Sequence, residues 1–376
     1  MPTADRNLTK AKINFNGRTL YDLLGGDNIE SDSIAIAEQI KNSKDANSTK
    51  VTIDFSNIEN DSIEIIDNGD GMNLQEIHDN WLTIGTTVKS DDNTKLGGKG
   101  IGRFSLFRLA DSITVETTQK NTTYNFTIDR NYLEENTLTD IEIYESTTNS
   151  QSGTKIILNK LSKRINLNEI EHGIQNLVYP ESDKIHEIIY PVTYQKRNYV
   201  SPSTYLEYAP FHATAVIEGT NIKNYSFQCI IKGDKYYENS KVNERLITEL
   251  NETLSKNFAN NINLGQINIE IHNFYFHRPY ISWHQDIDQN KIKDNMLVAY
   301  QGISVYRNGY KIYGHGEEDW LKLAELRLQR PGDNIDNKLT YGIITLDSDE
   351  SFKLKEKTNR EGFIKSPEYT YTLSKV

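Results

Sequence analysis

The chain has 376 residues, of which 36% are hydrophobic and 25% charged, so it is long enough for two domains and too apolar to be disordered. Its 42 basic and 53 acidic residues give a net charge of −11, which argues against non-specific nucleic-acid binding over the whole surface but is compatible with a local basic groove. The single cysteine, Cys229, excludes an internal disulfide and a thiolate metal site, and no run approaches the ~20 apolar residues of a membrane span. We therefore expect a cytoplasmic protein with no membrane partner.

The chain begins with a polar segment, residues 1–30, whose one apolar cluster lies at 20–24. This composition predicts an N-terminal arm, either a short packing helix or a segment that reaches a second subunit. A helical pattern follows, for which Ser31 or Asp32 is a suitable N-cap and which Asn47 ends.

Three polar side chains of this helix share one face. At roughly 100° of turn per residue, Glu38, Asn42 and Asp45 fall within about 60° of one another. A stripe of this kind is commonly the solvated side of an amphipathic helix, so by itself it does not predict a site.

Two period-two segments, 51–55 and 62–65, predict a hairpin-like pair of strands after the helix. The second strand leads directly into Asp-Asn-Gly-Asp-Gly at 67–71. In isolation this pentapeptide is typical of a tight turn. The alternative is a purine pocket, in which glycines let a flat base approach the backbone and a carboxylate accepts a hydrogen bond from an exocyclic amine.

A short helix at 74–81 precedes a long polar loop that is dense in glycine from Gly97 to Gly102 and is followed by an apolar helical run at 104–109. Backbone amides at a helix N-terminus, together with Lys95, Lys99 and Arg103, suit a polyphosphate. The sequence is not a Walker A motif, and a flexible surface loop is the alternative. Strand patterns follow at 112–117, 123–128, 140–144 and 153–158.

Taken in this order, four motifs resemble the GHKL superfamily of Bergerat-fold ATPases, which includes gyrase B, MutL, MORC proteins, heat-shock chaperones and sensor histidine kinases. The helix with Glu38 resembles the N-box, residues 67–72 the first glycine motif, 97–102 the second, and 153–154 the strand behind the adenine. The resemblance implies an α+β fold whose ATP-binding domain, an α/β sandwich, covers 31–180. Sensor kinases are disfavoured because residues 1–30 contain no phosphoacceptor histidine.

The resemblance also implies an ATPase that uses ATP and Mg²⁺, with a role for each matching residue. Glu38 would be the general base, Asn42 the Mg²⁺ ligand, Asp67 the partner of the adenine amine, and Thr154 its support through a water, while Asp45 would organise the pocket. Gln39 stands where the family usually has an apolar residue. The other expected nucleotide-binding residues are Gly69, Gly71, Met72, Lys95, Gly98, Lys99, Gly100, Ile101, Gly102, Arg103 and Phe104.

The second half, from about 185 to 376, is rich in aromatic strand patterns. Segments 225–232, 243–257 and 267–276 predict a β-α-β unit, and Asn-Gly within 306–310 predicts a hairpin. A helix at 320–328 and a strand at 341–346 complete this part.

The order of domains resembles gyrase B and MutL, in which a ribosomal-S-five-like transducer domain follows the ATPase domain and sends a basic residue to the γ-phosphate. The loop at 353–363 occupies the corresponding position, so Lys357 or Arg360 is the expected catalytic sensor residue. A solvated basic loop is the alternative.

Several potential metal ligands lie in the strand at 267–276 and in the loop after it. Their spacing alternates along an apparent strand and a loop without a second-shell pattern, so we expect ordinary structural or surface roles. These residues are His272, His277, His284, Asp286 and Asp288.

Three functions fit these features. The first is an ATP-gated dimeric clamp acting on nucleic acid, which the gyrase-like second domain favours. The second is a chaperone-like ATPase that remodels protein clients, which the net charge of −11 favours mildly. The third is a sensor ATPase of a bacterial defence system. The expected partners are ATP and a second copy of the chain in an ATP-dependent homodimer.

Overall fold

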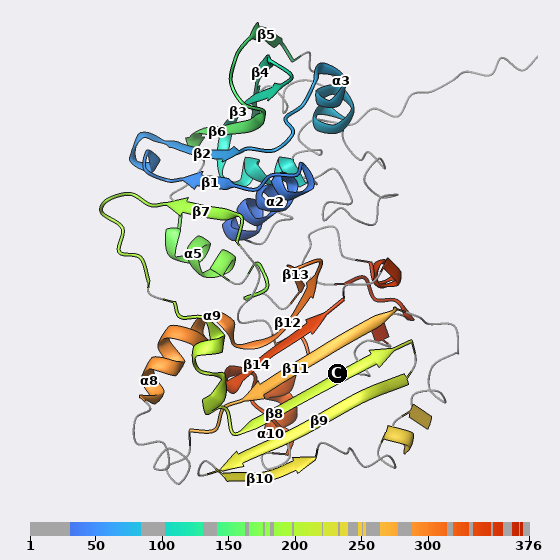
Figure 1. The fold of residues 1–376 in the computed structure, drawn as a ribbon. Coiled ribbons are helices and arrows are strands. Elements are labelled where there is room, and N and C mark those ends of the chain that lie inside the picture. The colour runs from blue at the N-terminus through green and yellow to red at the C-terminus, as the bar shows by residue number, and fades with distance from the viewer. Residues whose placement is uncertain are drawn as a thin grey trace, which may run out of the picture.

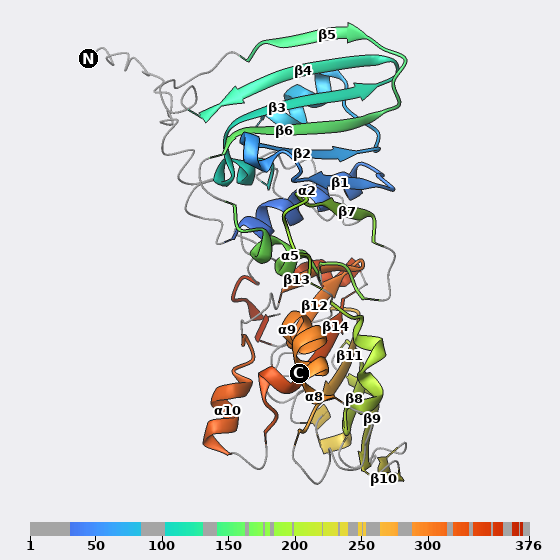
Figure 2. The same cartoon turned by 90° about the vertical axis from the view of Figure 1, so that its left-hand side faces the viewer.

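The fold consists of two mixed β-sheets with helices packed against them (Figures 1 and 2). No helix in the described part of the chain combines the length and hydropathy needed to cross a membrane. The computed structural model describes residues 31–83, 102–130, 141–161, 165–175, 177–180, 184–197, 199–219, 221–231, 234–239, 247–249, 251–252, 264–276, 288–313, 319–330, 334–346, 349–355, 363–367 and 369–370.

The first sheet has the strand order β5-β4-β3-β6-β2-β1-β7. Its neighbours are antiparallel except β1 and β7, which are parallel. The strands are β1 (Val51–Asp54), β2 (Ser62–Asp67), β3 (Ala110–Gln119), β4 (Thr122–Asp129), β5 (Ile143–Thr147), β6 (Gly153–Leu161) and β7 (His186–Ile189). The helical elements of this unit are α2 (Asp32–Asp45), η1 (Ile58–Asn60), α3 (Leu74–Glu76), η2 (Ile77–Leu82), η3 (Gly102–Arg108) and α5 (Leu167–Gln175).

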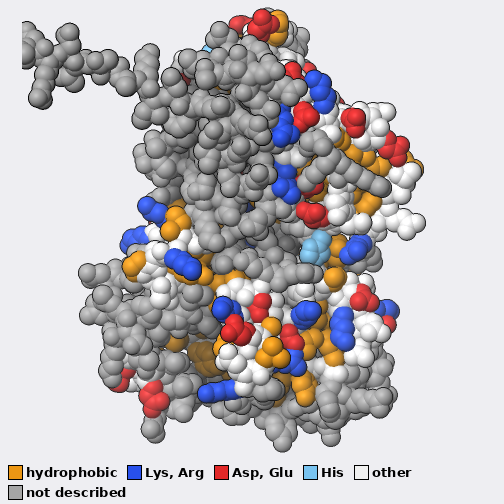
Figure 3. All heavy atoms as spheres, turned by 180° about the vertical axis from the view of Figure 1, so that it is seen from behind, with side chains coloured by type: hydrophobic (Ala, Val, Ile, Leu, Met, Phe, Trp, Pro, Cys, Tyr) orange, Lys and Arg blue, Asp and Glu red, His pale blue; other side chains and the backbone are white. Residues whose placement is uncertain are grey.

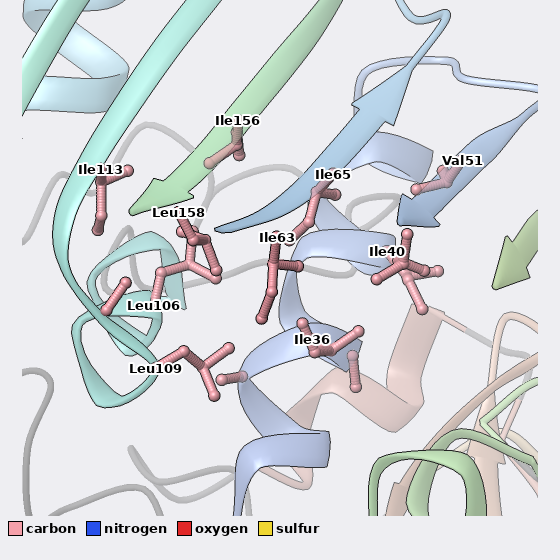
Figure 4. Packing of buried hydrophobic residues seen from close by; sticks show 14 of the residues in the cluster. Ile36, Ile40, Val51, Ile63, Ile65, Leu106, Leu109, Ile113, Ile156 and Leu158 are labelled. Atoms are coloured by element: carbon pink, nitrogen blue, oxygen red, sulfur yellow. The ribbon is translucent and has the colours of Figure 1, made fainter. Parts of the chain in front are cut away.

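One apolar core joins this sheet to α2, η3 and α5. Figure 4 shows Ile36 and Ile40 of α2 beside Ile63 and Ile65 of β2, while Leu106 of η3 lies near β6. The alternation of buried residues along β1 and β2 confirms the predicted period-two strands, which pair as an antiparallel hairpin. The core therefore fixes α2 across the strands that end at the candidate site.

Helix α2 begins where the sequence predicts. Ser31 is the N-cap, and its hydroxyl accepts a hydrogen bond from the Ile34 amide at 3.3 Å. Asp32 lies in the first turn, where its carboxylate pairs with the Arg108 guanidinium at 2.9 Å. This pair connects the start of α2 to η3.

The second sheet has the strand order β10-β9-β8-β11-β14-β12-β13. Its neighbours are antiparallel except β12 and β14, which are parallel. The strands are β8 (Phe211–Glu218), β9 (Asn221–Ile231), β10 (Asp234–Asn239), β11 (Gln266–Asn273), β12 (Gly302–Arg307), β13 (Tyr310–Tyr313) and β14 (Thr340–Thr345). The helical elements are η4 (Pro202–Thr204), η5 (Leu206–Tyr208), α8 (Gln289–Ile292), η6 (Lys293–Leu297), α9 (Val298–Tyr300), α10 (Leu323–Gln329), η7 (Asn337–Leu339) and η8 (Asp349–Lys353).

Two predicted features of this half differ from the structure. Strand β8 lies between β9 and β11, so these two strands are not neighbours. Helix α10 begins at Leu323 rather than Trp320, because the Asp319 carboxylate accepts hydrogen bonds from the Leu323 and Ala324 amides and the Trp320 indole donates to the Ile303 carbonyl. The predicted hairpin at 306–310 is confirmed by the pairing of β12 with β13.

Strand β7 lies beyond the expected end of the first domain but belongs to the first sheet. It pairs with β1, in a register that places Val51 opposite His186. The short alternating segment 186–189 carries no local sign of this long-range parallel partner. A boundary after β7 therefore fits the sheets better than one near residue 185.

Candidate nucleotide-binding site

The carboxylate of Asp67 lies at the end of β2 and is held by three hydrogen bonds. Oδ1 accepts from the Gly69 amide at 2.9 Å and the Thr154 amide at 3.2 Å, and Oδ2 accepts from the Ser43 hydroxyl at 2.9 Å. Burial raises the pKa of Asp67, while these hydrogen bonds act in the opposite direction. The carboxylate is therefore a fixed and partly desolvated acceptor.

The loop that begins at Asp67 is attached to the C-terminal end of α2. The Asp70 amide donates to the Ala46 carbonyl at 2.8 Å, and the side-chain nitrogen of Asn47 donates to Oδ2 of Asp70 at 2.7 Å. The side-chain oxygen of Asn68 accepts from the Lys50 amide at 2.8 Å. The N-box-like helix and the first glycine motif thus form one continuous unit.

Two glycines of this loop lie where a side chain does not fit. Gly71 has φ +67, and a Cβ on it would lie 1.9 Å from the Thr118 carbonyl oxygen. A Cβ on Gly69 would lie 2.6 Å from the Ala46 carbonyl oxygen. The backbone is therefore packed closely against both β3 and the end of α2.

The polar face of α2 contains buried charge. Glu38 is 3% exposed, and its carboxylate lies 3.7 Å from the Lys41 ammonium. The Asn42 side-chain nitrogen donates to Oε1 of Gln39 at 3.4 Å, which leaves the Asn42 side-chain oxygen as an acceptor. Gln39 donates in turn to the Ala35 carbonyl at 3.4 Å, so the helix itself accommodates this unusual buried amide.

A hydroxyl that the motifs did not predict supports Thr154. The Thr117 side chain lies 3.1 Å from the Thr154 hydroxyl and accepts a hydrogen bond from the Met72 amide at 2.9 Å. The register of β3 and β6 places Thr117 directly opposite Thr154. Ser43 is the second unpredicted residue, and no motif spacing distinguishes it from a serine that merely lies on a helix.

Arg103 joins the two flanks of the glycine-rich loop. Its guanidinium donates to the Thr83 carbonyl at 2.6 Å and lies 6.0 Å from the centroid of the Trp81 ring. Burial lowers the pKa of Arg103 to about 10. Gly102 and Phe104 lie in η3 beside it. The expected residues Lys95, Gly98, Lys99, Gly100 and Ile101, and the sensor candidates Lys357 and Arg360, lie outside the described residues.

The charge of Asp45, at the end of α2, acts on a tyrosine of the second sheet. Burial, and after it the charge of Asp45, raise the pKa of Tyr310 on β13 to about 12. The Tyr310 ring is buried in the core of the first sheet. Asp45 thus lies near the junction between the two units.

Of the five potential metal ligands singled out in the sequence, the structure describes Asp288 and His272. His277, His284 and Asp286 lie outside the described residues. Asp288 is the N-cap of α8 and accepts a hydrogen bond from the Asn290 amide at 2.9 Å, which is a structural role. His272 lies in β11.

The donor set fits an adenine nucleotide with a hard cation. A fixed carboxylate next to side-chain-free backbone can accept a hydrogen bond from the exocyclic amine of a flat base. The amide oxygen of Asn42 is the kind of ligand that Mg²⁺ prefers. The same helix carries the buried carboxylate of Glu38, a group capable of general-base chemistry.

Comparison with known proteins agrees with this geometry. Residues 29–162 match the model of the family described as "Histidine kinase-, DNA gyrase B-, and HSP90-like ATPase". The chain is also 30% identical over 138 residues to "Putative type II restriction enzyme HgiDII" from Herpetosiphon aurantiacus, a match that covers 34% of this chain and 22% of that relative. ATPases of the matched type bind ATP with Mg²⁺, and such a domain implies ATP hydrolysis. Residues 29–162 of this chain are therefore a GHKL-type ATPase domain.

Proposed function

We propose that this chain is a Mg²⁺-dependent ATPase that works as an ATP-gated dimeric clamp on nucleic acid within a bacterial defence system. The observation that carries the ATP-binding part of the proposal is the Asp67 carboxylate, held at three points between α2, β2 and β6. A carboxylate fixed in this way is pre-organised for one acceptor role, because binding does not have to order it.

Each residue of the site has a distinct role in the proposal. Asp67 accepts a hydrogen bond from the adenine amine, and Thr154, supported by Thr117, orders a water beside it. The amide oxygen of Asn42 holds Mg²⁺, which would neutralise charge on the phosphates. Glu38 takes a proton from the water that attacks the γ-phosphate.

The second sheet is proposed to act as the transducer domain, of the ribosomal-S-five-like type, with the boundary placed after β7. Support comes from the mixed sheet and from the hydrogen bonds that tie β13 to segment 177–180 of the first unit. Lys357 or Arg360 would reach the γ-phosphate, and the segment with Gly98, Lys99 and Gly100 would close over the phosphates.

The defence and nucleic-acid parts of the proposal are supported by the name of the relative, which describes a restriction enzyme. On the face seen in Figure 3, basic and acidic side chains of the described residues lie interspersed rather than in a patch of one sign. Nucleic acid would accordingly need a local groove, and a chaperone-like action on protein clients is the competing outcome.

Hydrolysis is tested with two variants of α2 and a control on the same helix. Glu38→Gln should retain ATP binding and lose at least about 100-fold in turnover, the range for removing a general base. Asn42→Ala should weaken binding of Mg²⁺-ATP. Lys44→Ala, at an exposed position, is the control and should behave as wild type. Unchanged turnover in Glu38→Gln would refute the assignment of the base.

The clamp is tested by light scattering after size exclusion, with and without a non-hydrolysable ATP analogue, on wild type and Arg360→Ala. The clamp predicts a doubled mass with the analogue, and no change in mass would contradict it. DNA-stimulated turnover or salt-sensitive DNA binding would support nucleic acid as cargo, whereas stimulation by unfolded protein alone would favour the chaperone.

A further inference from the structure

A second group of chemically reactive side chains lies in the other sheet, on neighbouring strands β8 and β11 (Figure 1). The antiparallel register places His212 directly opposite His272, and Glu270 lies two positions before His272 on the same face. We propose that His212, His272 and Glu270 form a binding site for a divalent transition-metal ion, specifically Zn²⁺.

The side chains of His212, His272 and Glu270 lie close together in the structure. The two imidazole rings are stacked with centroids 4.1 Å apart and planes 11° apart. Oε1 of Glu270 lies 2.7 Å from Nε2 of His272 and 3.7 Å from Nε2 of His212. One ligand atom from each residue lies within 4.8 Å of the others.

These separations are close to those around a single ion. With Zn–N distances of about 2.0–2.1 Å and tetrahedral angles, two ligand atoms lie about 3.3 Å apart. Because a metal ion lies in the plane of each imidazole that binds it, the stacked ring of His212 must turn about its side-chain bonds until the two ring planes converge on the ion. Two imidazoles and a carboxylate are a ligand set that suits Zn²⁺, whereas Mg²⁺ and Ca²⁺ prefer oxygen ligands alone.

A purely structural role does not account for the two histidines. The bond between His272 and Glu270 satisfies one nitrogen, but within the described part of the chain the buried Nε2 of His212 and Nδ1 of His272 have no hydrogen-bond partner. Buried polar atoms without a partner are uncommon in folded proteins, and coordination of an ion is one way to satisfy Nε2 of His212. A metal would engage Nε2 of His212 directly.

The two faces of β8 and β11 have different surroundings. Residues on the other face of the same strands, Ile217 and Ile267, pack into an apolar core. On the face with the histidines, Tyr341 of β14 lies opposite His272 and belongs to a second apolar core, whereas Gln228 of β9 lies opposite His212 and hydrogen-bonds its side chain, which orients the ring.

The site is open on one side. The His272 side chain is 7% exposed, while those of His212 and Glu270 are 28% and 40% exposed. A cation can therefore reach the ligands from solvent, and a water or a group from another molecule can take the fourth position. Because the ligands come from two strands, the ion would link β8 to β11.

The test uses the full chain, freed of metal by dialysis against a chelator and kept free of nucleotide, so that its result does not depend on the ATPase proposal. ZnCl₂ is titrated calorimetrically into wild type, His212→Asn, His272→Asn, Glu270→Gln and the control His78→Asn. His78 is exposed and lies in the first unit.

Wild type and the control should bind one Zn²⁺ per chain and gain a few °C in Tm on binding. Each histidine variant should bind at least about tenfold more weakly and lose the gain in Tm. If His272→Asn fails to fold, His212→Asn and Glu270→Gln, at more exposed positions, carry the test. Absence of saturable binding by wild type, or equal affinity in the variants, would overturn the proposal.

Discussion

Replacement of Asp67 by asparagine separates the nucleotide-binding role of this residue from its structural role. The asparagine side chain keeps one oxygen, which can take the place of Oδ1 and accept from the Gly69 and Thr154 amides. Its nitrogen takes the place of Oδ2, and the Ser43 hydroxyl, which now donates to Oδ2, can rotate to accept from that nitrogen. The fold should therefore survive the change, while the acceptor offered to the adenine amine is lost.

The expected loss of ATP affinity follows from the hydrogen bond between the adenine amine and the Asp67 carboxylate. A hydrogen bond to a charged acceptor contributes about 1.5–3 kcal/mol, and about 1.4 kcal/mol corresponds to a tenfold change in affinity. With the adenine amine facing a donor instead of a carboxylate, ATP should bind about 10–150-fold more weakly. Calorimetric titration of ATP into wild type and Asp67→Asn measures this directly, and a change of less than about threefold would refute the adenine role.

The same substitution, which weakens ATP binding, should not destabilise the nucleotide-free fold. Burial raises the pKa of Asp67 above its ordinary value, so near that pKa the folded state binds more protons than the unfolded state, and stability falls as the pH rises through this range. At neutral pH the ionised carboxylate is therefore a net cost to the nucleotide-free fold. We expect Asp67→Asn to unfold at the same temperature as wild type or higher, measured without nucleotide. A lower Tm would show that the carboxylate acts mainly in folding.

Two further predictions concern a buried lysine and a closely packed glycine. Lys311 is fully buried, its ammonium has no partner within the described part of the chain, and burial lowers its pKa to about 7. Between that pH and about 10.5 the unfolded state binds the proton that the folded state lacks, so wild-type stability should rise with pH by up to about 5 kcal/mol. Lys311→Met should be more stable at pH 7 and lose this rise in denaturant titrations, and an unchanged pH dependence would contradict the reasoning. Gly71→Ala places a Cβ 1.9 Å from the Thr118 carbonyl oxygen at φ +67. We therefore expect it to lower the free energy of unfolding by at least about 2 kcal/mol, measured by thermal unfolding. An unchanged Tm would contradict the close packing of this loop.

Local patterns predicted the elements that depend on local physics. The serine cap of α2 and the alternating burial of β1 and β2 are visible in a few neighbouring residues. Strands β7 and β8 were not predicted as parts of their sheets. A four-residue strand such as β7 has too short an alternation to identify, and its parallel partner β1 lies far away in sequence. Strand β8 does alternate, with Phe211, Ala213, Ala215 and Ile217 on one face, but its place between β9 and β11 depends on long-range pairing that a local pattern does not show.

The residues of the candidate site also divide into those that a local sequence motif predicts and those that only the fold brings together. Asp67 and Thr154 were predicted from their motifs, and the structure joins them by a hydrogen bond across 87 positions of sequence. Ser43 and Thr117 contact these residues, yet a single hydroxyl has no spacing pattern that would reveal it. The pairing of His212 with His272 depends on the register of two distant strands, which only the fold supplies.

The junction between the two sheets limits how nucleotide could act at a distance. The Lys311 amide donates to the Leu177 carbonyl at 2.8 Å, and the Tyr179 amide donates to the Gly309 carbonyl at 2.9 Å. Because buried backbone groups are costly to leave unpaired, separating the sheets here would require new partners for each of them. A rearrangement that starts at α2 must therefore move both sheets together or exchange these contacts for others of similar free energy.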